Sequence, residues 1–308
     1  MQLTATDHDY HNCVNTSLSE ISAEARAAAC SKAIADPQTN DRTLSEAYSN
    51  RASMRLDGGV HASIDEIIAD LDHALRLNPT LMQARYNRGK AYYRKGDYNR
   101  ALADLNVAVG LDPGFAETHK MLSIVHRDLG KIDTAMDDIT VSMRLNPNDA
   151  ETLAIRGHLY SRFKQQQDLA IADLTAAIRI APNYEIAHLT LANAYFLKSD
   201  YVHAISEYDA TIRLNPNELN ALEYRDACYS MDLNPRDPHT LNQRGLIYLE
   251  LNDLDRALAD LNEAIRLKSD YAMAYKNRSK VYAARGDRAR ADADLAEAIR
   301  LDPEISRL

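Results

Sequence analysis

The residues of this chain best suited to chemistry are its histidines and cysteines. His8, His11 and Cys13 lie close together near the start of the sequence, and these residue types can bind a soft divalent metal ion. His119 and His126 are seven residues apart, which places both on one face of a helix. A tetrahedral metal site needs ligands held in a fixed geometry, and neither segment supplies one. The sequence therefore predicts no metal site, and His119 and His126 are expected to pack beside the core.

The first two cysteines could form a disulfide. Cys13 and Cys30 are 17 positions apart, and a bond between them would stabilise the fold by about 3 kcal/mol in the chain-entropy model. In a reducing compartment both thiols would stay free, and Cys30 would be a small core residue. The sequence leaves both alternatives open. The third cysteine, Cys228, is predicted to be buried.

No motif of a common enzyme class is present. The sequence has no G-x-x-x-x-G-K-[ST], G-x-S-x-G or H-E-x-x-H motif and no paired C-x-x-C. Its 36 basic and 45 acidic residues give a net charge of −9, which argues against a nucleic-acid surface built on overall positive charge. No apolar run of 18 residues is present, as a membrane-spanning helix would require. We therefore predict a protein that is not an enzyme, needs no cofactor, binds no nucleic acid and does not insert into a membrane.

The beginning of the chain bears on its location. The first 30 residues lack a basic segment followed by an apolar one, which is the pattern of a secretory signal peptide. This favours a cytoplasmic protein. A periplasmic or exported location stays open for the case in which the native N-terminus has been trimmed.

A repeat of about 34 residues organises most of the chain. One position of the repeat, which follows the second helix and is usually proline, recurs at Pro79, Pro113, Pro147, Pro182, Pro216, Pro235, Ser269 and Pro303. The successive spacings are 34, 34, 35, 34, 19, 34 and 34. Each repeat predicts two amphipathic helices, since apolar residues follow helical spacing and proline ends the second helix. Such a pair cannot bury its apolar face alone, so it must stack on its neighbours.

The small and large residues of the repeat follow a recognisable pattern. In the repeat 82–115 it is carried by Gly89, Tyr92, Gly96, Asp97, Tyr98, Ala101, Leu105, Ala108 and Pro113. This pattern resembles the tetratricopeptide repeat (TPR) family over about residues 45–305, although the usual tryptophan of the first helix is missing. The resemblance implies an all-α fold, a right-handed α-solenoid (superhelix) of tandem helix-turn-helix repeats. Gly96 is expected to take the positive φ that a helix end requires.

The repeat also predicts how the chain is divided. We expect a mobile tail over 1–15, a capping helix and linker over 16–44, five repeats over 45–218, a partial repeat over 219–237 and two repeats over 238–305. The partial repeat fits either a first or a second helix, so one helix is missing. We predict a break in the superhelix near 219–238, while a loop defect without functional meaning is the alternative.

Arginine and aspartate recur at fixed slots. First helices carry Arg51, Arg88, Arg156, Arg244 and Arg278, and second helices carry Asp70, Asp104, Asp173, Asp260 and Asp294. Each arginine is predicted to pair with the aspartate of its own repeat through charge-assisted hydrogen bonds. Partly exposed pairs of this kind stabilise by about 0–1 kcal/mol each. Their regular recurrence indicates a register device, not a catalytic dyad.

The TPR resemblance also implies a binding groove. In that family the first helices line a concave surface, and carrying their ligand-contacting slots over to this sequence gives Tyr86, Asn87, Lys90, Tyr93, Arg94, Lys120, Arg127, His158, Arg162, Leu189, Asn193, Phe196 and Leu197. Cations gather in the first part of this set and apolar residues in the last. A locally positive groove would attract an acidic segment, and arginine and tyrosine are frequent anchors of binding hot spots.

The sequence therefore predicts a non-catalytic scaffold that binds a partner peptide or protein segment in the concave groove, with an acidic part of the partner beside the cations. The five-residue clamp of chaperone-binding TPR proteins is absent. Three alternatives stay open. The groove residues could be ordinary solvated positions, the chain could self-associate through its last helix, near 289–301, or it could be the regulatory part of a larger complex.

Overall fold

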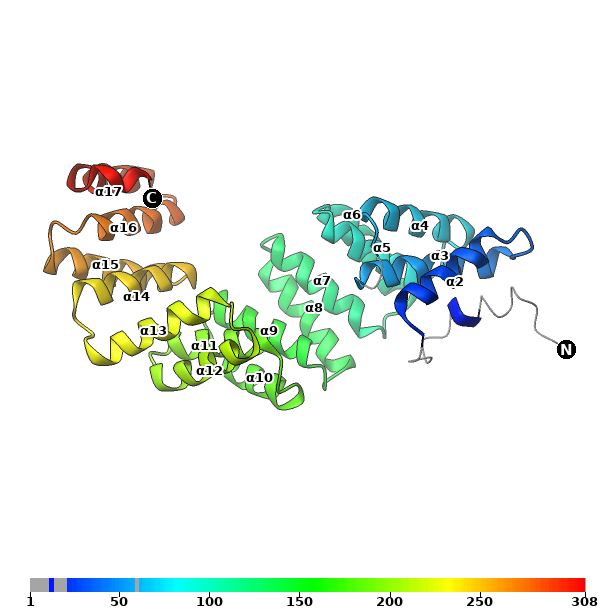
Figure 1. The fold of residues 1–308 in the computed structure, drawn as a ribbon, viewed down its shortest axis with the longest axis horizontal. Coiled ribbons are helices and arrows are strands. Elements are labelled where there is room, and N and C mark those ends of the chain that lie inside the picture. Colours follow the sequence, from blue (N-terminus) through cyan, green and yellow to red (C-terminus); the bar gives the residue numbers. More distant parts are fainter. Residues whose placement is uncertain (1–10, 14–20, 59–60, 308) are drawn as a thin grey trace. The chain divides into compact units, whose positions relative to one another are not determined.

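The computed structural model describes residues 11–13, 21–58 and 61–307, and over these residues it is all-helical (Figure 1). Residues 1–147, here the N-terminal half, and residues 148–308, the C-terminal half, form two compact units. The N-terminal half contains α2 (Ala23–Ala35), α3 (Asp41–Leu56), α4 (Ile64–Leu77), α5 (Met82–Arg94), α6 (Tyr98–Leu111), α7 (Ala116–Asp128) and α8 (Ile132–Leu145).

The C-terminal half begins with α9 (Ala150–Arg162), α10 (Gln167–Ile180), α11 (Glu185–Leu197), α12 (Tyr201–Leu214) and α13 (Leu219–Leu233). It continues with α14 (Pro238–Glu250), α15 (Leu254–Leu267), α16 (Ala272–Ala284), α17 (Arg288–Leu301) and the short 3-10 helix η1 (Pro303–Arg307). Except for α13, the helices from α3 to α17 form adjacent pairs, each with a first and a second helix. The predicted all-α fold of tandem helix-turn-helix repeats is confirmed.

Aspartates begin several of the second helices. Asp97 accepts a hydrogen bond of 3.0 Å from the backbone N–H of Arg100 at the start of α6. Asp253 and Asp287 begin α15 and α17 in the same way. The first N–H groups of a helix have no partner within it, so such a cap typically stabilises by about 1 kcal/mol.

The turn within each helix pair needs one residue with a left-handed backbone. Gly96 has the predicted positive φ, at 80°. The N-terminal half places glycine at its turns, with Gly58, Gly96 and Gly130 all at positive φ. The C-terminal half has Gln165, Ser199 and Asn252 at φ of 52°, 61° and 62°, and glycine returns only at Gly286. A side chain in this conformation costs about 1–2 kcal/mol.

Glycines let the two helices of a pair approach closely. A Cβ atom added at Gly89 would lie 2.8 Å from Cγ of Leu105, and one added at Gly157 would lie 2.7 Å from Cγ of Leu174. These distances are shorter than any normal carbon–carbon contact. The small residue in the first helix and the leucine in the second therefore fit together as one packing unit.

The predicted arginine–aspartate pairs form in all five repeats that carry them. They are Arg51–Asp70, Arg88–Asp104, Arg156–Asp173, Arg244–Asp260 and Arg278–Asp294, each joined by two hydrogen bonds between 2.6 and 2.9 Å. The aspartates are at most 8% exposed, while the side chains of the arginines are 16–19% exposed, so each pair joins a partly exposed cation to a buried carboxylate. Loss of one arginine would leave a buried carboxylate unpaired, which costs about 3–5 kcal/mol.

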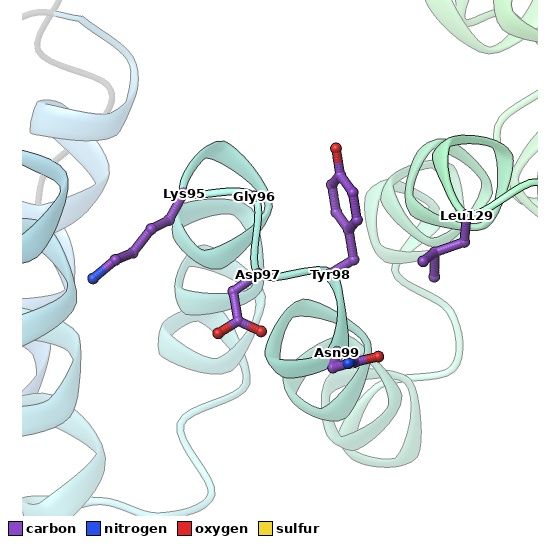
Figure 2. A pocket seen from close by; sticks show the side chains of 6 residues that line it. All are labelled: Lys95, Gly96, Asp97, Tyr98, Asn99 and Leu129. Atoms are coloured by element: carbon purple, nitrogen blue, oxygen red, sulfur yellow. The ribbon is translucent and has the colours of Figure 1, made fainter.

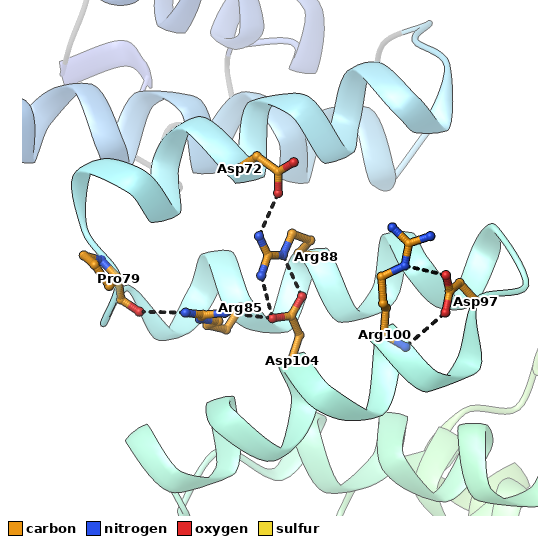
Figure 3. A network of polar contacts seen from close by, with 7 residues as sticks. All are labelled: Asp72, Pro79, Arg85, Arg88, Asp97, Arg100 and Asp104. Carbon is orange, nitrogen blue, oxygen red and sulfur yellow. Dashed lines mark hydrogen bonds and ion pairs between the residues drawn. The ribbon is translucent and has the colours of Figure 1, made fainter.

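In the N-terminal half, two of these aspartates each accept hydrogen bonds from two arginines. Asp104 accepts hydrogen bonds from Arg88 and also from Arg85, at 3.0 Å, while Arg88 reaches back to Asp72 on α4 (Figure 3). Asp70 likewise accepts from Arg51 and from Arg55. In the described C-terminal half, the corresponding aspartates of α10, α15 and α17 each accept from a single arginine.

The start of the described chain is tied to α2. Cys13 and Cys30 form a disulfide, and both are buried in a small apolar cluster shared by α2 and α3. Of the two alternatives that the sequence left open, the structure has the bridged one. The predicted mobile tail over 1–15, apart from 11–13, and residues 16–20 of the predicted capping segment lie outside the described residues.

A single helix, α13, stands between the pairs α11/α12 and α14/α15. Arg225 of α13 binds Asp209 of α12 at 3.1 Å, and these residues are 16 positions apart. Arg88 and Asp72 are also 16 positions apart and join a first helix to the preceding second helix. This match identifies α13 as a first helix, so the second helix of this repeat is missing.

The hydrophobic core continues through α13. One cluster of buried side chains extends from Ala192 on α11 to Val281 on α16 and includes Tyr224 and Cys228 of α13. The irregular repeat, where the sequence predicted a break near 219–238, is therefore packed into a continuous core. The regular succession of helix pairs is interrupted there by the single helix α13. The chain divides into its two compact units after Pro147. No helix of the described chain is long and apolar enough to cross a lipid bilayer.

Candidate functional site

Four predicted binding residues of the N-terminal half keep part of their side chains in solvent. They are Lys90, Tyr93, Arg94 and Arg127, on α5 and α7, and we call them the N-terminal binding face. Lys90 Nζ lies 3.2 Å from Asp57 Oδ1. Tyr93 donates a hydrogen bond of 2.7 Å to Asp128, and Arg127 Nε lies 2.8 Å from the other oxygen of that carboxylate. The face is thus a set of short-range polar pairs.

The positive charge of this face is smaller than the sequence suggested. Lys90 and Arg127 each lie beside a carboxylate, and Arg94 donates to the main-chain oxygen of Leu56 at the end of α3. Asp57 was not among the predicted residues. Asp57 occupies in the first repeat the position that Arg94 occupies in the second. An alignment of the repeats could therefore have predicted Asp57 as a residue of this face.

Three other predicted residues of this half are buried. Tyr86 packs edge-to-face on Phe115 at 5.3 Å between ring centroids. Lys120 is 6% exposed, and its Nζ lies 2.8 Å from Glu117. Asn87 is 1% exposed, and its Nδ2 has no hydrogen-bond partner among the described residues. Neighbouring first helices lie close enough to bury all three side chains. The Tyr86 ring lies next to the N-terminal binding face, since Lys90 Nζ is 5.6 Å from its centroid.

Tyr93 is a neutral donor over a wide pH range. Burial raises its pKa to about 12, and the hydrogen bond to the Asp128 carboxylate acts in the same direction. The hydroxyl therefore keeps its proton near neutral pH and remains a donor, at present to Asp128.

In the C-terminal half, four predicted residues come together. His158 and Arg162 of α9 and Asn193 and Leu197 of α11 line one cavity of about 40 Å³, which we call the C-terminal cavity. Its remaining walls are Ser161, Thr190 and Leu251. The lining contains a guanidinium, an imidazole, two hydroxyls and an amide, and it contains no carboxylate.

The end of α14 closes this cavity. Arg162 of α9 donates a hydrogen bond to the main-chain oxygen of Glu250, the last residue of α14. Arg256 of α15 donates to the main-chain oxygen of Leu197, at the end of α11. The sequence did not predict Leu251 or Glu250 here, because it placed the repeats after 238 beyond a break.

The apolar patch predicted after the cations is not an open surface. Phe196 is fully buried, with its ring centroid 5.4 Å from that of Tyr248 on α14 and 6.4 Å from that of Tyr224 on α13. Leu197 is 5% exposed, and Leu189 is partly buried against the same core. The helix α13 packs beside α11 as the next first helix does in a complete repeat, and the missing second helix brings α14 against Phe196 as well.

The remaining reactive groups serve the fold. His126 Nδ1 lies 2.7 Å from Asp138 Oδ2, so this histidine joins α7 to α8. The described residues contain no cluster of histidine, cysteine and acidic side chains that could hold a metal ion. Cys228 is buried as predicted, and burial raises its pKa to about 12, so its thiol is not a reactive thiolate.

One open depression lies at the turn between α5 and α6 (Figure 2). It is lined by Lys95, Gly96, Asp97, Tyr98, Asn99 and Leu129. Lys95 forms an ion pair with Asp65, and Asp97 caps α6. Both charged groups are thus used by the fold, and the depression is not a candidate site.

Comparison with known proteins agrees with the repeat. Residues 83–115 and 150–184 match models described as tetratricopeptide repeat, and residues 245–286 match a model described as TPR repeat. No curated protein matches the chain.

Solved structures share the fold at low sequence identity. The pilF protein of Pseudomonas aeruginosa is 14% identical over 78% of this chain and 99% of its own, with a TM-score of 0.53. A monomeric mutant of IFIT1 with Gppp-AAAA is 16% identical over 91% of this chain and 67% of its own, with a TM-score of 0.54. The APC/C hetero-tetramer Cut9–Hcn1 contains a chain 17% identical over 97% of this chain and 52% of its own, with a TM-score of 0.51. From its repeat, its helix pairs and these matches, the chain is a tandem tetratricopeptide-repeat protein.

Proposed function

We propose that this protein is a non-catalytic scaffold that binds an extended or helical segment of a partner protein on its N-terminal binding face. Tandem TPR arrays are typical of protein-interaction scaffolds, and stacked repeats present extended surfaces to their ligands. Lys90, Tyr93, Arg94 and Arg127 offer three cations and a neutral donor along α5 and α7.

The observation that carries this proposal is the Nδ2 donor of Asn87, which has no hydrogen-bond partner among the described residues, whereas the Oδ1 of the same amide accepts from Gln83 at 3.5 Å. A buried donor without a partner costs about 1–3 kcal/mol, which a main-chain carbonyl of a bound segment would recover. The C-terminal half supplies an internal comparison, since Asn277 Nδ2 donates to Asn242 Oδ1 at 3.0 Å. In the N-terminal half the slot of Asn242 holds Ser49, whose Oγ is also buried without a hydrogen-bond partner among the described residues.

The cations of the face fit acidic side chains of the partner. Lys90 and Arg127 would exchange their present partners, Asp57 and Asp128, for carboxylates of the bound segment. Exposed ion pairs contribute only about 0–1 kcal/mol, so this exchange costs little. Binding should therefore weaken with salt, but only modestly.

A matched pair of triple variants tests this proposal. The first carries Lys90→Ser, Arg94→Ser and Arg127→Ser. The control carries Arg76→Ser, Arg100→Ser and Arg144→Ser on the exposed surfaces of α4, α6 and α8. Both remove three positive charges. A partner captured by the intact chain from its native lysate is identified by mass spectrometry and then titrated by calorimetry.

We expect the first variant to bind that partner at least about 10-fold more weakly, which corresponds to 1.4 kcal/mol, and the control to stay within about 2-fold. Asn87→Ala should weaken binding as well. Equal affinities for both triple variants would overturn the proposed site, even though a partner exists.

Self-association is the second candidate function. Ala289, Ala293 and Ala296 of α17 are exposed, and so are the larger Leu295 and Ile299. Small residues on one side of a helix permit close packing against a second copy. A mass that rises with protein concentration in sedimentation would favour this function, and a strict monomer would exclude it.

A further inference from the structure

The irregular repeat creates a second opening in the C-terminal half. Because α13 has no second helix, α14 follows it directly, and the two first helices are in contact. A cleft of about 80 Å³ opens between them, which we call the α13–α14 cleft. It is lined by Glu223, Tyr224, Ala227, Gln243, Leu246, Ile247 and Glu250. First helices of neighbouring complete repeats also contact one another, as α9 and α11 do at the C-terminal cavity, but that cavity contains no carboxylate, whereas the α13–α14 cleft contains two.

The cleft has an apolar floor and an acidic rim. Tyr224, Ala227 and Ile247 are each 5% exposed and form the floor. Glu223 and Glu250 are exposed at the rim. No basic residue lines the cleft. This combination suits a ligand group with an apolar stem and a positive end.

The two carboxylates of the rim are available to such a group. Glu223 makes no hydrogen bond or ion pair with any residue that the structure describes. The Glu250 carboxylate accepts a hydrogen bond from the Tyr224 hydroxyl. Arg162 binds the main-chain oxygen of Glu250 and not its carboxylate. Burial, together with this hydrogen bond, raises the pKa of Tyr224 far above its usual value, so a neutral donor fixes the position of the Glu250 carboxylate.

We propose that the α13–α14 cleft binds a lysine or arginine side chain of a partner segment. The aliphatic stem would lie on Ala227 and Ile247, as basic side chains commonly lie on apolar surface. The ammonium or guanidinium group would lie between Glu223 and Glu250 and form charge-assisted hydrogen bonds.

The size of the cleft agrees with this ligand. One water molecule needs roughly 10–15 Å³ of such space, so about 80 Å³ holds about six heavy atoms. A lysine side chain has five and an arginine side chain has seven. This site goes beyond the function proposed above, since it lies on other helices, needs no residue of the N-terminal binding face and selects the opposite charge.

Small probes test the cleft without a known partner. The N-acetyl N-methylamides of lysine, arginine and norleucine are titrated into the full chain carrying 13C-labelled methyl groups. Norleucine keeps the stem but lacks the charge. We expect the two basic probes to shift the methyl signals of Leu246 and Ile247, and norleucine to bind about 10-fold more weakly. The ratio of the lysine and arginine affinities then shows which residue the cleft prefers.

Substitutions of Glu223 and Glu250 test whether the carboxylates at the rim of the cleft bind the basic probes. Glu223→Gln and Glu250→Gln should each weaken the basic probes by about 2- to 5-fold, the range of an exposed ion pair. Glu263→Gln, at an exposed carboxylate on α15 outside the cleft, should change nothing. If Glu250→Gln disturbs α14 itself, Glu223→Gln still tests whether a rim carboxylate binds the probes, because Glu223 makes no hydrogen bond or ion pair with another described residue.

Three results would overturn the proposal. Equal affinities of norleucine and lysine would show an apolar hollow without charge selection. Unshifted Leu246 and Ile247 signals with every probe would show that the cleft is closed. A concentration-dependent mass in sedimentation that Glu223→Gln abolishes would assign the cleft to a second copy of the chain. None of these results bears on the N-terminal binding face, which the triple variants test separately.

Discussion

The two halves of this protein use the same repeat and present different surfaces. In the N-terminal half each first helix from α3 to α7 is followed by its second helix, and polar side chains such as Lys90 and Arg127 stay at the surface. In the C-terminal half one second helix is missing, so α14 reaches α9 and α11 and encloses Arg162 and Phe196. The loss of one helix thus replaces an open face with a cavity and a cleft.

The halves also differ in how their folds are secured. The N-terminal half has two arginines on each of Asp70 and Asp104, glycine at its turns and a disulfide. The C-terminal half has one arginine for each aspartate, three turns with side chains at positive φ, and the unbonded Cys228. The C-terminal half should therefore respond more strongly to the loss of single contacts.

The largest expected effect concerns the buried ion pairs. Arg156→Ala leaves Asp173 buried and unpaired, so it should lower the free energy of unfolding of the C-terminal half by about 3–5 kcal/mol. Arg51→Ala should cost less, about 1–2 kcal/mol, because Arg55 still binds Asp70. Hydrogen exchange in urea, followed by mass spectrometry, measures each half separately. Equal losses would show that the second arginine contributes nothing.

Reduction of the disulfide should affect one half only. The bond between Cys13 and Cys30 closes a loop of 17 positions, so reduction should destabilise the N-terminal half by about 3 kcal/mol. Urea unfolding with and without reductant, read by the same hydrogen exchange, measures this change. The double variant Cys13→Ala, Cys30→Ala is the control and should not respond to reductant. A similar loss of stability in the C-terminal half would contradict the prediction that the disulfide stabilises the N-terminal half alone.

Alkaline pH should act mainly on the C-terminal half. The pKa of Cys228 is raised from 9.0 to about 12, so the folded state keeps a proton that the unfolded state releases. The contribution of Cys228 to the free energy of unfolding is therefore fully present below pH 9 and is lost as the pH rises from about 9 to about 12. At pH 10 the loss should be about 1 kcal/mol. Cys228→Ala should remove the part of the loss that begins near pH 9. Burial also raises the pKa of Tyr208, Tyr224 and Tyr248, so a further loss that begins near pH 10 should remain in that variant. An unchanged profile between pH 9 and pH 10 would contradict the prediction.

The smallest expected effects concern the turns. Gln165→Gly should stabilise the C-terminal half by about 0.5 kcal/mol, because glycine removes the cost of a side chain at positive φ but adds entropy to the unfolded chain. Gly96→Ala should destabilise the N-terminal half by about 1 kcal/mol. Melting temperatures of the two variants measure both changes. A Gln165→Gly variant less stable than the parent would indicate that the Gln165 side chain makes a stabilising contact.

Much of the fold could be predicted from the sequence because its signals are local. The turn at Gly96, the helix ends before the recurring prolines and the pairing of Arg88 with Asp104 all follow from spacing within one repeat. The candidate site was less predictable. Lys90 and Arg127 lie at the surface as the register implies, but Tyr86 and Lys120 are buried because neighbouring first helices enclose them. How deeply these side chains are buried depends on the distance between neighbouring repeats, and the positions of residues within one repeat do not determine that distance.

The sequence by itself determined the number and order of the helix pairs and the place where a helix is missing. These features follow from the 34-residue period and its one interval of 19. The tertiary structure decided what the missing helix does. It showed that α13 is a first helix, that Leu251 closes a cavity beside Arg162, and that Glu223 and Glu250 flank an apolar cleft. These contacts join residues up to 88 positions apart, and such contacts depend on how successive repeats pack, which no pattern within one repeat specifies.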